Sequence, residues 1–255
     1  MGKYNFDDLC RIIERLRGKG GCPWDAEQTH ESIKKCMVEE AYEAVEAIES
    51  GDMAKVYDEL GDLLLQVVMH AQIAKENGEF DMDDITNAIS TKMIRRHPHV
   101  FGDTKVKNSD EVLDNWEEIK KVEKGESKTS ESLESVAHSL PALMRAQKVQ
   151  KRAAKVGFDW EDVSGAIDKI KEETAELEEA INNGTNTEEE LGDLLFSVVN
   201  VARFVKVDSE EALTQSTRKF ISRFTKMEDE ILKSGKRLEN LSLKEMDGIW
   251  TKIKH

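Results

Sequence analysis

The chain contains few prolines and few cysteines, and each shortage excludes a class of protein. Three prolines in 255 residues leave long segments rich in Glu, Lys, Leu and Ala, which favour helix by intrinsic propensity. The three cysteines, Cys10, Cys22 and Cys36, form no C-x-x-C pair. A disulfide framework is therefore not predicted, and a reducing cytoplasm is the expected location.

Positive charge and long apolar runs are also scarce. The 37 Lys and Arg residues face 52 Asp and Glu residues, which gives a formal net charge of −15. Nucleic acids and anionic membranes bind basic surfaces, so neither is an expected partner. No apolar stretch approaches the roughly 20 residues of a membrane span, and the first residues carry charges where an export signal is apolar. A nucleotide substrate stays compatible, because a bound cation can bridge acidic protein and phosphate.

What the sequence does have is an acidic motif that occurs twice. Residues 39–43 read E-E-A-Y-E and precede E-L-G-D-L-L-L at 59–65, while residues 172–176 read E-E-T-A-E and precede E-L-G-D-L-L-F at 190–196. An internal repeat of this kind sets the domain plan. We predict an N-terminal helical domain at 1–124, a polar, Ser-rich linker at 125–135 and a C-terminal helical domain at 136–255.

The apolar residues around these motifs follow helical spacing. Leu60, Leu63, Leu64 and Val67 recur at intervals of three and four, and no alternating strand pattern is present, so the predicted class is all-α. One short helix pair buries little apolar surface, and two pairs make a four-helix bundle. The second pair would come from the other repeat or from another subunit, and the sequence leaves both open.

Each repeat places five carboxylates on two successive helices. Glu40 and Glu43 lie three residues apart on one helix face, as do Glu59 and Asp62. Carboxylates gathered in one place repel each other unless a cation neutralises them, and Mg²⁺ prefers such oxygen ligands. We therefore predict a magnesium site in each repeat. The alternative is a duplicated structural helix pair whose acidic faces are solvated.

A basic pair follows each acidic motif. Lys92 and Arg96 lie four residues apart, as do Lys219 and Arg223, and Arg95 adds a further cation to the first repeat. Near a magnesium cluster, such cations can hold phosphate oxygens and stabilise charge on a leaving group. The pattern favours a polyphosphate substrate.

Taken together, these motifs resemble the MazG family of nucleoside triphosphate pyrophosphohydrolases. The first repeat carries the resemblance in G-C-P-W-D-A-E-Q-T-H (21–30), the acidic motif and R-R-H-P-H-V-F-G (95–102). The second carries it in G-F-D-W (157–160), its acidic motif and K-F-I-S-R-F (219–224). The resemblance covers nearly the whole chain, and the combination of motifs is highly specific to this family.

The resemblance implies an all-α homodimer with intertwined four-helix bundles. It implies Mg²⁺-dependent hydrolysis of nucleoside triphosphates to monophosphate and pyrophosphate, with broad base tolerance and with Mn²⁺ as a substitute metal. By position, the implied metal ligands are Glu40, Glu43, Glu59 and Asp62 in the first repeat and Glu173, Glu176, Glu190 and Asp193 in the second. The implied nucleotide contacts are Lys92, Arg95 and Arg96, and in the second repeat Lys169, Lys219, Arg223 and Trp250.

The general base is the least constrained assignment. Glu39 or Glu172 is the candidate, because a one-residue step along a helix turns its carboxylate away from the ligand face. A pyrophosphohydrolase of narrower base preference is one rival interpretation. A nucleotide-sensing or protein-interaction bundle, with one or both repeats non-catalytic, is another. Nothing in the sequence indicates a particular protein partner.

Overall fold

The computed structural model describes residues 2–125 and 127–253 and confirms the predicted class. Within these residues the secondary structure is helical and contains no strand. The chain divides into two compact units, Met1–Lys120 and Lys121–His255. A search of the described helices finds none that is both long enough and apolar enough to cross a bilayer.

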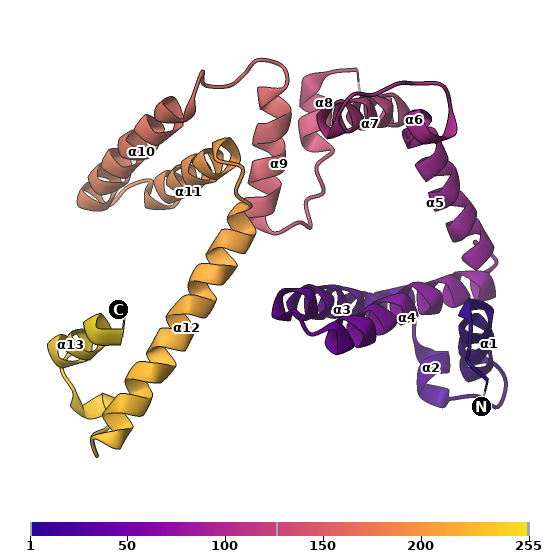
Figure 1. Cartoon of the computed structure of the whole chain (residues 1–255), viewed down its shortest axis with the longest axis horizontal. Helices are drawn as coiled ribbons and strands as arrows, with labels where there is room; N and C mark the ends of the chain where they lie inside the picture. Colours follow the sequence, from indigo (N-terminus) through magenta and orange to yellow (C-terminus); the bar gives the residue numbers. More distant parts are fainter. Residues whose placement is uncertain (1, 126, 254–255) are drawn as a thin grey trace. The chain divides into compact units, whose positions relative to one another are not determined.

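The first unit is organised around one long antiparallel helix pair, α3 and α4, against which α1 packs (Figure 1). Its helices are α1 (Phe6–Arg17), α2 (Pro23–Glu27), α3 (His30–Ser50), α4 (Met53–Asn77), α5 (Met82–Arg96), α6 (Pro98–Phe101) and α7 (Ser109–Lys124). The end of α7 lies beyond the boundary of this unit.

The second unit repeats this plan with the pair α10 and α11, against which α9 packs. Its helices are α8 (Thr129–Glu134), α9 (Ala142–Ala154), α10 (Val163–Asn183), α11 (Thr187–Phe204), α12 (Ser209–Lys233), the 3₁₀ helix η1 (Leu238–Asn240) and α13 (Leu243–Ile253). α12 contacts α9 and α13 (Figure 1).

Both helix pairs turn at a left-handed glycine. Gly51 ends α3 with φ 71° and Gly184 ends α10 with φ 68°, a region that residues with a Cβ rarely adopt. Asp52 then caps α4 by accepting a hydrogen bond from the backbone N–H of Ala54. Gly184 follows Gly51 by the same 133 residues that separate Glu172 from Glu39. The repetition therefore includes the turn that sets the register of each pair.

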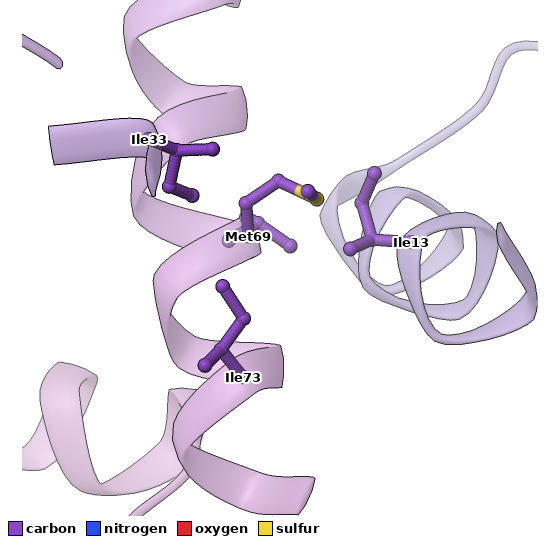
Figure 2. Close-up of a cluster of buried hydrophobic side chains, with 5 residues drawn as sticks. Ile13, Ile33, Met69 and Ile73 are labelled. Atoms are coloured by element: carbon purple, nitrogen blue, oxygen red, sulfur yellow. The ribbon is translucent and has the colours of Figure 1, made fainter. Parts of the chain in front are cut away.

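A small hydrophobic core fixes α1 on the first helix pair (Figure 2). Ile13 of α1, Ile33 of α3, and Met69 and Ile73 of α4 meet there and are almost fully buried. Burying a large aliphatic side chain stabilises the fold by about 1.5–3 kcal/mol. This core anchors the first turn of α3, and Glu40 and Glu43 lie further along the same helix.

In the second unit, the side chains of α9 hold neighbouring backbone segments. Gln150 donates to the carbonyl of Phe196 at 2.8 Å, and Gln147 donates to that of Val207 at 2.7 Å. Arg152 donates to the carbonyl of Ser132, which lies inside the segment predicted as a linker. That segment, 125–135, contains α8, and α8 packs on α9. The boundary between the units falls slightly earlier, after Lys120.

Arg17 is the buried cation of the first unit. Its guanidinium donates to the Glu76 carboxylate at 2.8 Å and to the carbonyls of Asp25 and Gln28, and its side chain is 4% exposed. The Arg17 hydrogen bonds also hold the pKa of Glu76 below its ordinary value. These contacts tie the C-terminal end of α1 to α4 and to the segment around α2.

We expect Arg17→Ala to destabilise the chain by about 3 kcal/mol, because it leaves a carboxylate and two carbonyls without their donor. Urea unfolding measures the loss. Arg11→Ala is the matched control, since the Arg11–Asp8 pair is exposed and its removal should cost about 0.5 kcal/mol or less. Equal losses in the two variants would contradict the structural role of Arg17.

Candidate functional site

The first acidic cluster forms across the α3–α4 pair. Glu40 and Glu43 of α3 and Glu59 of α4 each present a carboxylate oxygen, and these oxygens all lie within 4.8 Å of one another. Partial burial raises the pKa of Glu40, and the carboxylates of Asp62 and Glu43 raise it further. Asp62 therefore lies close to the cluster, although it is outside the group of three.

The second cluster forms across α10 and α11, with one acid from α10 and two from α11. Oxygens of Glu173, Glu190 and Asp193 lie within 4.8 Å of one another. Glu190 occupies the first turn of α11, where the partial positive charge of a helix N-terminus favours a carboxylate. The pKa of Glu190 is nevertheless raised, first by burial and then by Glu176 and Glu173. Glu176 thus belongs to the same electrostatic group.

Glu173 carries the clearest mark of a ligand. The residue is 4% exposed, and its Oε2 is buried without a hydrogen-bond partner among the described residues. A buried carboxylate oxygen left without a partner is unfavourable, and a cation at that position would remove the cost. The donors are all carboxylate oxygens, which fits a hard divalent cation such as Mg²⁺ or Mn²⁺.

Lys169 supplies part of the charge balance in the second cluster. Its ammonium lies 2.9 Å from Glu172 and 2.5 Å from Glu173, and these hydrogen bonds, that to Glu173 foremost, raise the pKa of Lys169. The family resemblance implies a nucleotide contact for Lys169, and in the structure its ammonium contacts the carboxylates of Glu172 and Glu173. The equivalent position of the first repeat, 133 residues earlier, is Cys36. The first cluster therefore lacks a cation at the position that Lys169 occupies in the second.

The two candidate bases lie beside the clusters. Glu39 and Glu172 are both exposed and precede Glu40 and Glu173 by one residue. Neither belongs to the groups of three converging carboxylates. Glu172 accepts a hydrogen bond from Lys169, which would have to be released or shared if Glu172 took a proton.

The basic residues of the second repeat are not brought to the acidic cluster of their own chain. Lys219 and Arg223 lie on α12, which leads away from the α10–α11 pair (Figure 1). In the described part of the chain, neither forms an ion pair with the cluster. Trp250 of α13 packs against Phe220 of α12, with ring centroids 5.2 Å apart. Lys219, Arg223 and Trp250 thus share the α12–α13 region.

The basic residues of the first repeat are arranged differently. Lys92, Arg95 and Arg96 lie on α5, which leads away from the α3–α4 pair (Figure 1). The Arg96 guanidinium lies 5.2 Å from the ring centroid of Trp116, and the Lys120 ammonium lies 4.5 Å from it. Two cations therefore lie against Trp116 in the first repeat, whereas a phenylalanine packs against Trp250 in the second.

The apolar residues beside the acids are only partly covered. Leu60 and Leu64, which follow the helical spacing of α4, are 48% and 39% exposed. Leu191 and Leu195 of the second repeat are 48% and 49% exposed. Each α-helical pair therefore retains an uncovered apolar face next to its carboxylates. The sequence pattern correctly identified the helix face but not what covers it.

Glu40 should destabilise the metal-free chain at neutral pH. Its pKa is raised in the folded state, so this penalty is present at pH 7 and is relieved as the pH falls through the raised pKa toward 4.5. We expect Glu40→Gln to raise the Tm in EDTA at pH 7 by about 1–2 °C, and to have little effect at pH 4.5.

Thermal unfolding from pH 4.5 to pH 7, with and without Mg²⁺, tests this expectation. With Mg²⁺, the unmodified chain should have a higher Tm than Glu40→Gln, because only the intact cluster gains binding energy from the ion. Glu46→Gln, an exposed change on the same helix outside the cluster, is the control. A lower Tm for Glu40→Gln in EDTA at pH 7 would contradict the electrostatic account.

Comparison with known proteins agrees with the repeated architecture. The family model of the MazG nucleotide pyrophosphohydrolase domain matches residues 28–101 and 161–227, one segment in each repeat. The nucleoside triphosphate pyrophosphohydrolase/pyrophosphatase MazG of Thermotoga maritima is 48% identical, over 98% of this chain and 95% of that protein. The nucleoside triphosphate pyrophosphohydrolase of Escherichia coli K12 is 45% identical, over 98% of this chain and 97% of that protein. The chain belongs to the MazG nucleotide pyrophosphohydrolase family.

Proposed function

We propose that the chain is a Mg²⁺-dependent pyrophosphohydrolase that converts nucleoside and deoxynucleoside triphosphates to monophosphate and pyrophosphate. The observation that carries the proposal is the second acidic cluster, in which a buried Glu173 oxygen has no partner among the described residues. Relatives that match nearly the full chain are named for the same reaction. The proposal also includes broad base specificity. The chain would act on the nucleotide pool of the cytoplasm and clear unwanted nucleotides from it.

In the second repeat, Glu173, Glu190 and Asp193 would hold the ion, with Glu176 beside them. A bound Mg²⁺ supplies Lewis-acid polarisation of a phosphoryl oxygen and acidifies a coordinated water. Glu172 would accept the proton of the attacking water, a role supported by its exposure and its place beside the cluster. Its hydrogen bond to Lys169 orients the carboxylate, and the same lysine can move to a phosphate oxygen.

Lys219, Arg223 and Trp250 would bind the substrate from the other side. The two cations suit phosphate oxygens, and the Trp250 ring, supported by Phe220, suits stacking on a base. Since α12 leads away from the cluster of its own chain, we propose that the site is completed by a second chain in a homodimer. The uncovered apolar faces beside both clusters support this assembly, because pairing them would complete four-helix bundles.

A second function, nucleotide or phosphate binding without turnover, is favoured for the first repeat by two observations. Cys36 replaces the cation that Lys169 supplies in the second cluster. Arg96 and Lys120 lie against Trp116, so that ring is engaged by cations. The proposed arrangement is one catalytic repeat and one binding repeat in each chain.

Product identification tests the reaction. Purified chain is incubated with Mg²⁺ and, separately, with each common ribonucleoside and deoxyribonucleoside triphosphate, and products are separated by anion-exchange chromatography. Monophosphate and pyrophosphate in equal amounts from most substrates support the proposal. Diphosphate and phosphate would mean cleavage at a different bond, and turnover of a single base would replace broad specificity by a selective enzyme. Binding without products would favour the sensing function for both repeats.

A further inference from the structure

Arg145 of α9 carries a buried hydrogen-bond donor that no other described residue satisfies. Gln147, Gln150 and Arg152 each hydrogen bond to a neighbouring segment. Two polar atoms of α9 are nevertheless buried without a hydrogen-bond partner within residues 2–125 and 127–253, the donor Nε of Arg145 and the acceptor Oε1 of Gln150. A buried guanidinium N–H without an acceptor is unfavourable. A bound ligand that supplies an acceptor atom would remove this cost.

Arg145 lines a cavity of about 540 Å³ formed by α8, the segment before α9, α9 and α11. Its other walls are mostly apolar and include Leu133, Leu140, Val149 and Phe196. This volume lies within the range of pockets that hold small organic ligands, roughly 300–1,000 Å³. The cavity therefore combines apolar walls and an aromatic ring with one cationic donor.

Within the described residues Arg145 forms no ion pair, although the Glu210 carboxylate accepts a hydrogen bond from the N–H of the adjacent Met144 at 3.4 Å. Glu134 lines the same cavity, but its side chain is 80% exposed and its carboxylate lies 3.9 Å from the Nε2 of His138. His138 itself is 71% exposed, so the pair occupies the rim. The cavity is also distinct from the second acidic cluster, whose ligands Glu173, Glu190 and Asp193 are absent from its lining.

We propose that this cavity binds a small organic anion, whose carboxylate or phosphate accepts hydrogen bonds from Arg145 and whose apolar or aromatic body contacts Leu133, Val149 and Phe196. Arginine suits such groups because its planar guanidinium can offer two parallel N–H donors. The apolar walls select a ligand with a hydrophobic body over inorganic phosphate. The site lies beyond the proposed catalytic cluster and does not depend on it.

The test uses the full-length chain in EDTA, which prevents metal-dependent binding at the acidic clusters. Phenyl phosphate, benzoate, inorganic phosphate and neutral benzyl alcohol are titrated separately. The arginine Nε–H signals and the Leu and Val methyl signals are followed by NMR, with the Arg145 signal assigned by its loss in Arg145→Lys. We expect phenyl phosphate or benzoate to shift the Arg145 Nε–H together with the Leu133 and Val149 methyls. Inorganic phosphate and benzyl alcohol should bind at least about tenfold more weakly.

Two variants keep the proposal falsifiable. Arg145→Met should weaken binding of the anionic probes by roughly 10–100-fold while leaving the benzyl alcohol affinity unchanged. Glu134→Gln should leave binding unchanged or strengthen it, because Glu134 is a competing anion at the rim. Equal binding of neutral and anionic probes, or an Arg145 signal that does not move, would overturn the proposal. Strengthened probe binding on dilution to the monomer would identify a second chain as the natural occupant and would also overturn it.

Discussion

Glu173→Gln should lower the rate of pyrophosphate release by about 100-fold or more, since the lost carboxylate charge supplies several kcal/mol of metal-dependent transition-state stabilisation. The change keeps the shape of a side chain that is 4% exposed, so the packing of α10 against α11 should be preserved. The variant removes one of three converging oxygens and leaves Glu190 and Asp193 in place. Initial rates of pyrophosphate release under saturating Mg²⁺ measure the effect.

Two matched variants test whether the loss of activity is specific to the second cluster. Glu40→Gln changes the equivalent position of the first repeat, and we expect it to retain most of the activity because catalysis is assigned to the second repeat. Glu188→Gln changes an exposed acid of α11 outside the cluster and should behave as the unmodified chain. The opposite ranking, with Glu40→Gln inactive and Glu173→Gln active, would move catalysis to the first repeat. Full activity in both variants would contradict the role of the clusters.

Two inactive variants should restore each other if the site is shared between chains. Glu173→Gln damages the acidic cluster, and Arg223→Ala removes a cation of α12 that is proposed to bind phosphate. In a mixed dimer of the two, one site combines both defects and the other combines both intact parts. Random mixing of equal amounts should therefore recover about a quarter of the sites in a two-fold symmetric dimer.

The complementation has an internal control. A mixture of Glu173→Gln with Glu190→Gln carries both defects on the acidic side, so every site remains damaged and no recovery is expected. The variants are unfolded together and refolded so that chains exchange, and activity is compared with that of each variant treated alone. A mixture of Glu173→Gln and Arg223→Ala that stays inactive, although mixed dimers form, would place the acids and the cations of one site in the same chain.

The sequence predicted the helix pairs well because their signals are local. The spacing of Leu60, Leu63 and Leu64 marks one apolar face of α4, the acids three residues apart mark the acidic faces of α3 and α4, and a left-handed glycine ends α3 and α10. The clusters follow from those faces, so Glu40, Glu43 and Glu59 converge as expected. This periodicity was enough to predict the all-α class.

Other features could not be predicted because they depend on tertiary contacts. The segment 125–135 is polar enough to suggest a linker, yet it contains α8, and Arg152 of α9 donates to the carbonyl of Ser132 within it. The contact of Lys169 with Glu173 is local by contrast, because the two residues lie four apart on α10, and this spacing was a usable signal. The direction of α12 away from the cluster was not visible, since spacing alone does not set the angle between helices.

The account rests on the claim that both carboxylate clusters are divalent-cation sites. Binding of Mn²⁺ to the full chain, measured by electron paramagnetic resonance, tests it directly. We expect at least one ion per cluster, with Glu173→Gln and Glu40→Gln each weakening a different class of site by about 10–100-fold. Mn²⁺ binding that neither variant changes would contradict the account, because the converging carboxylates would then not be the ligands.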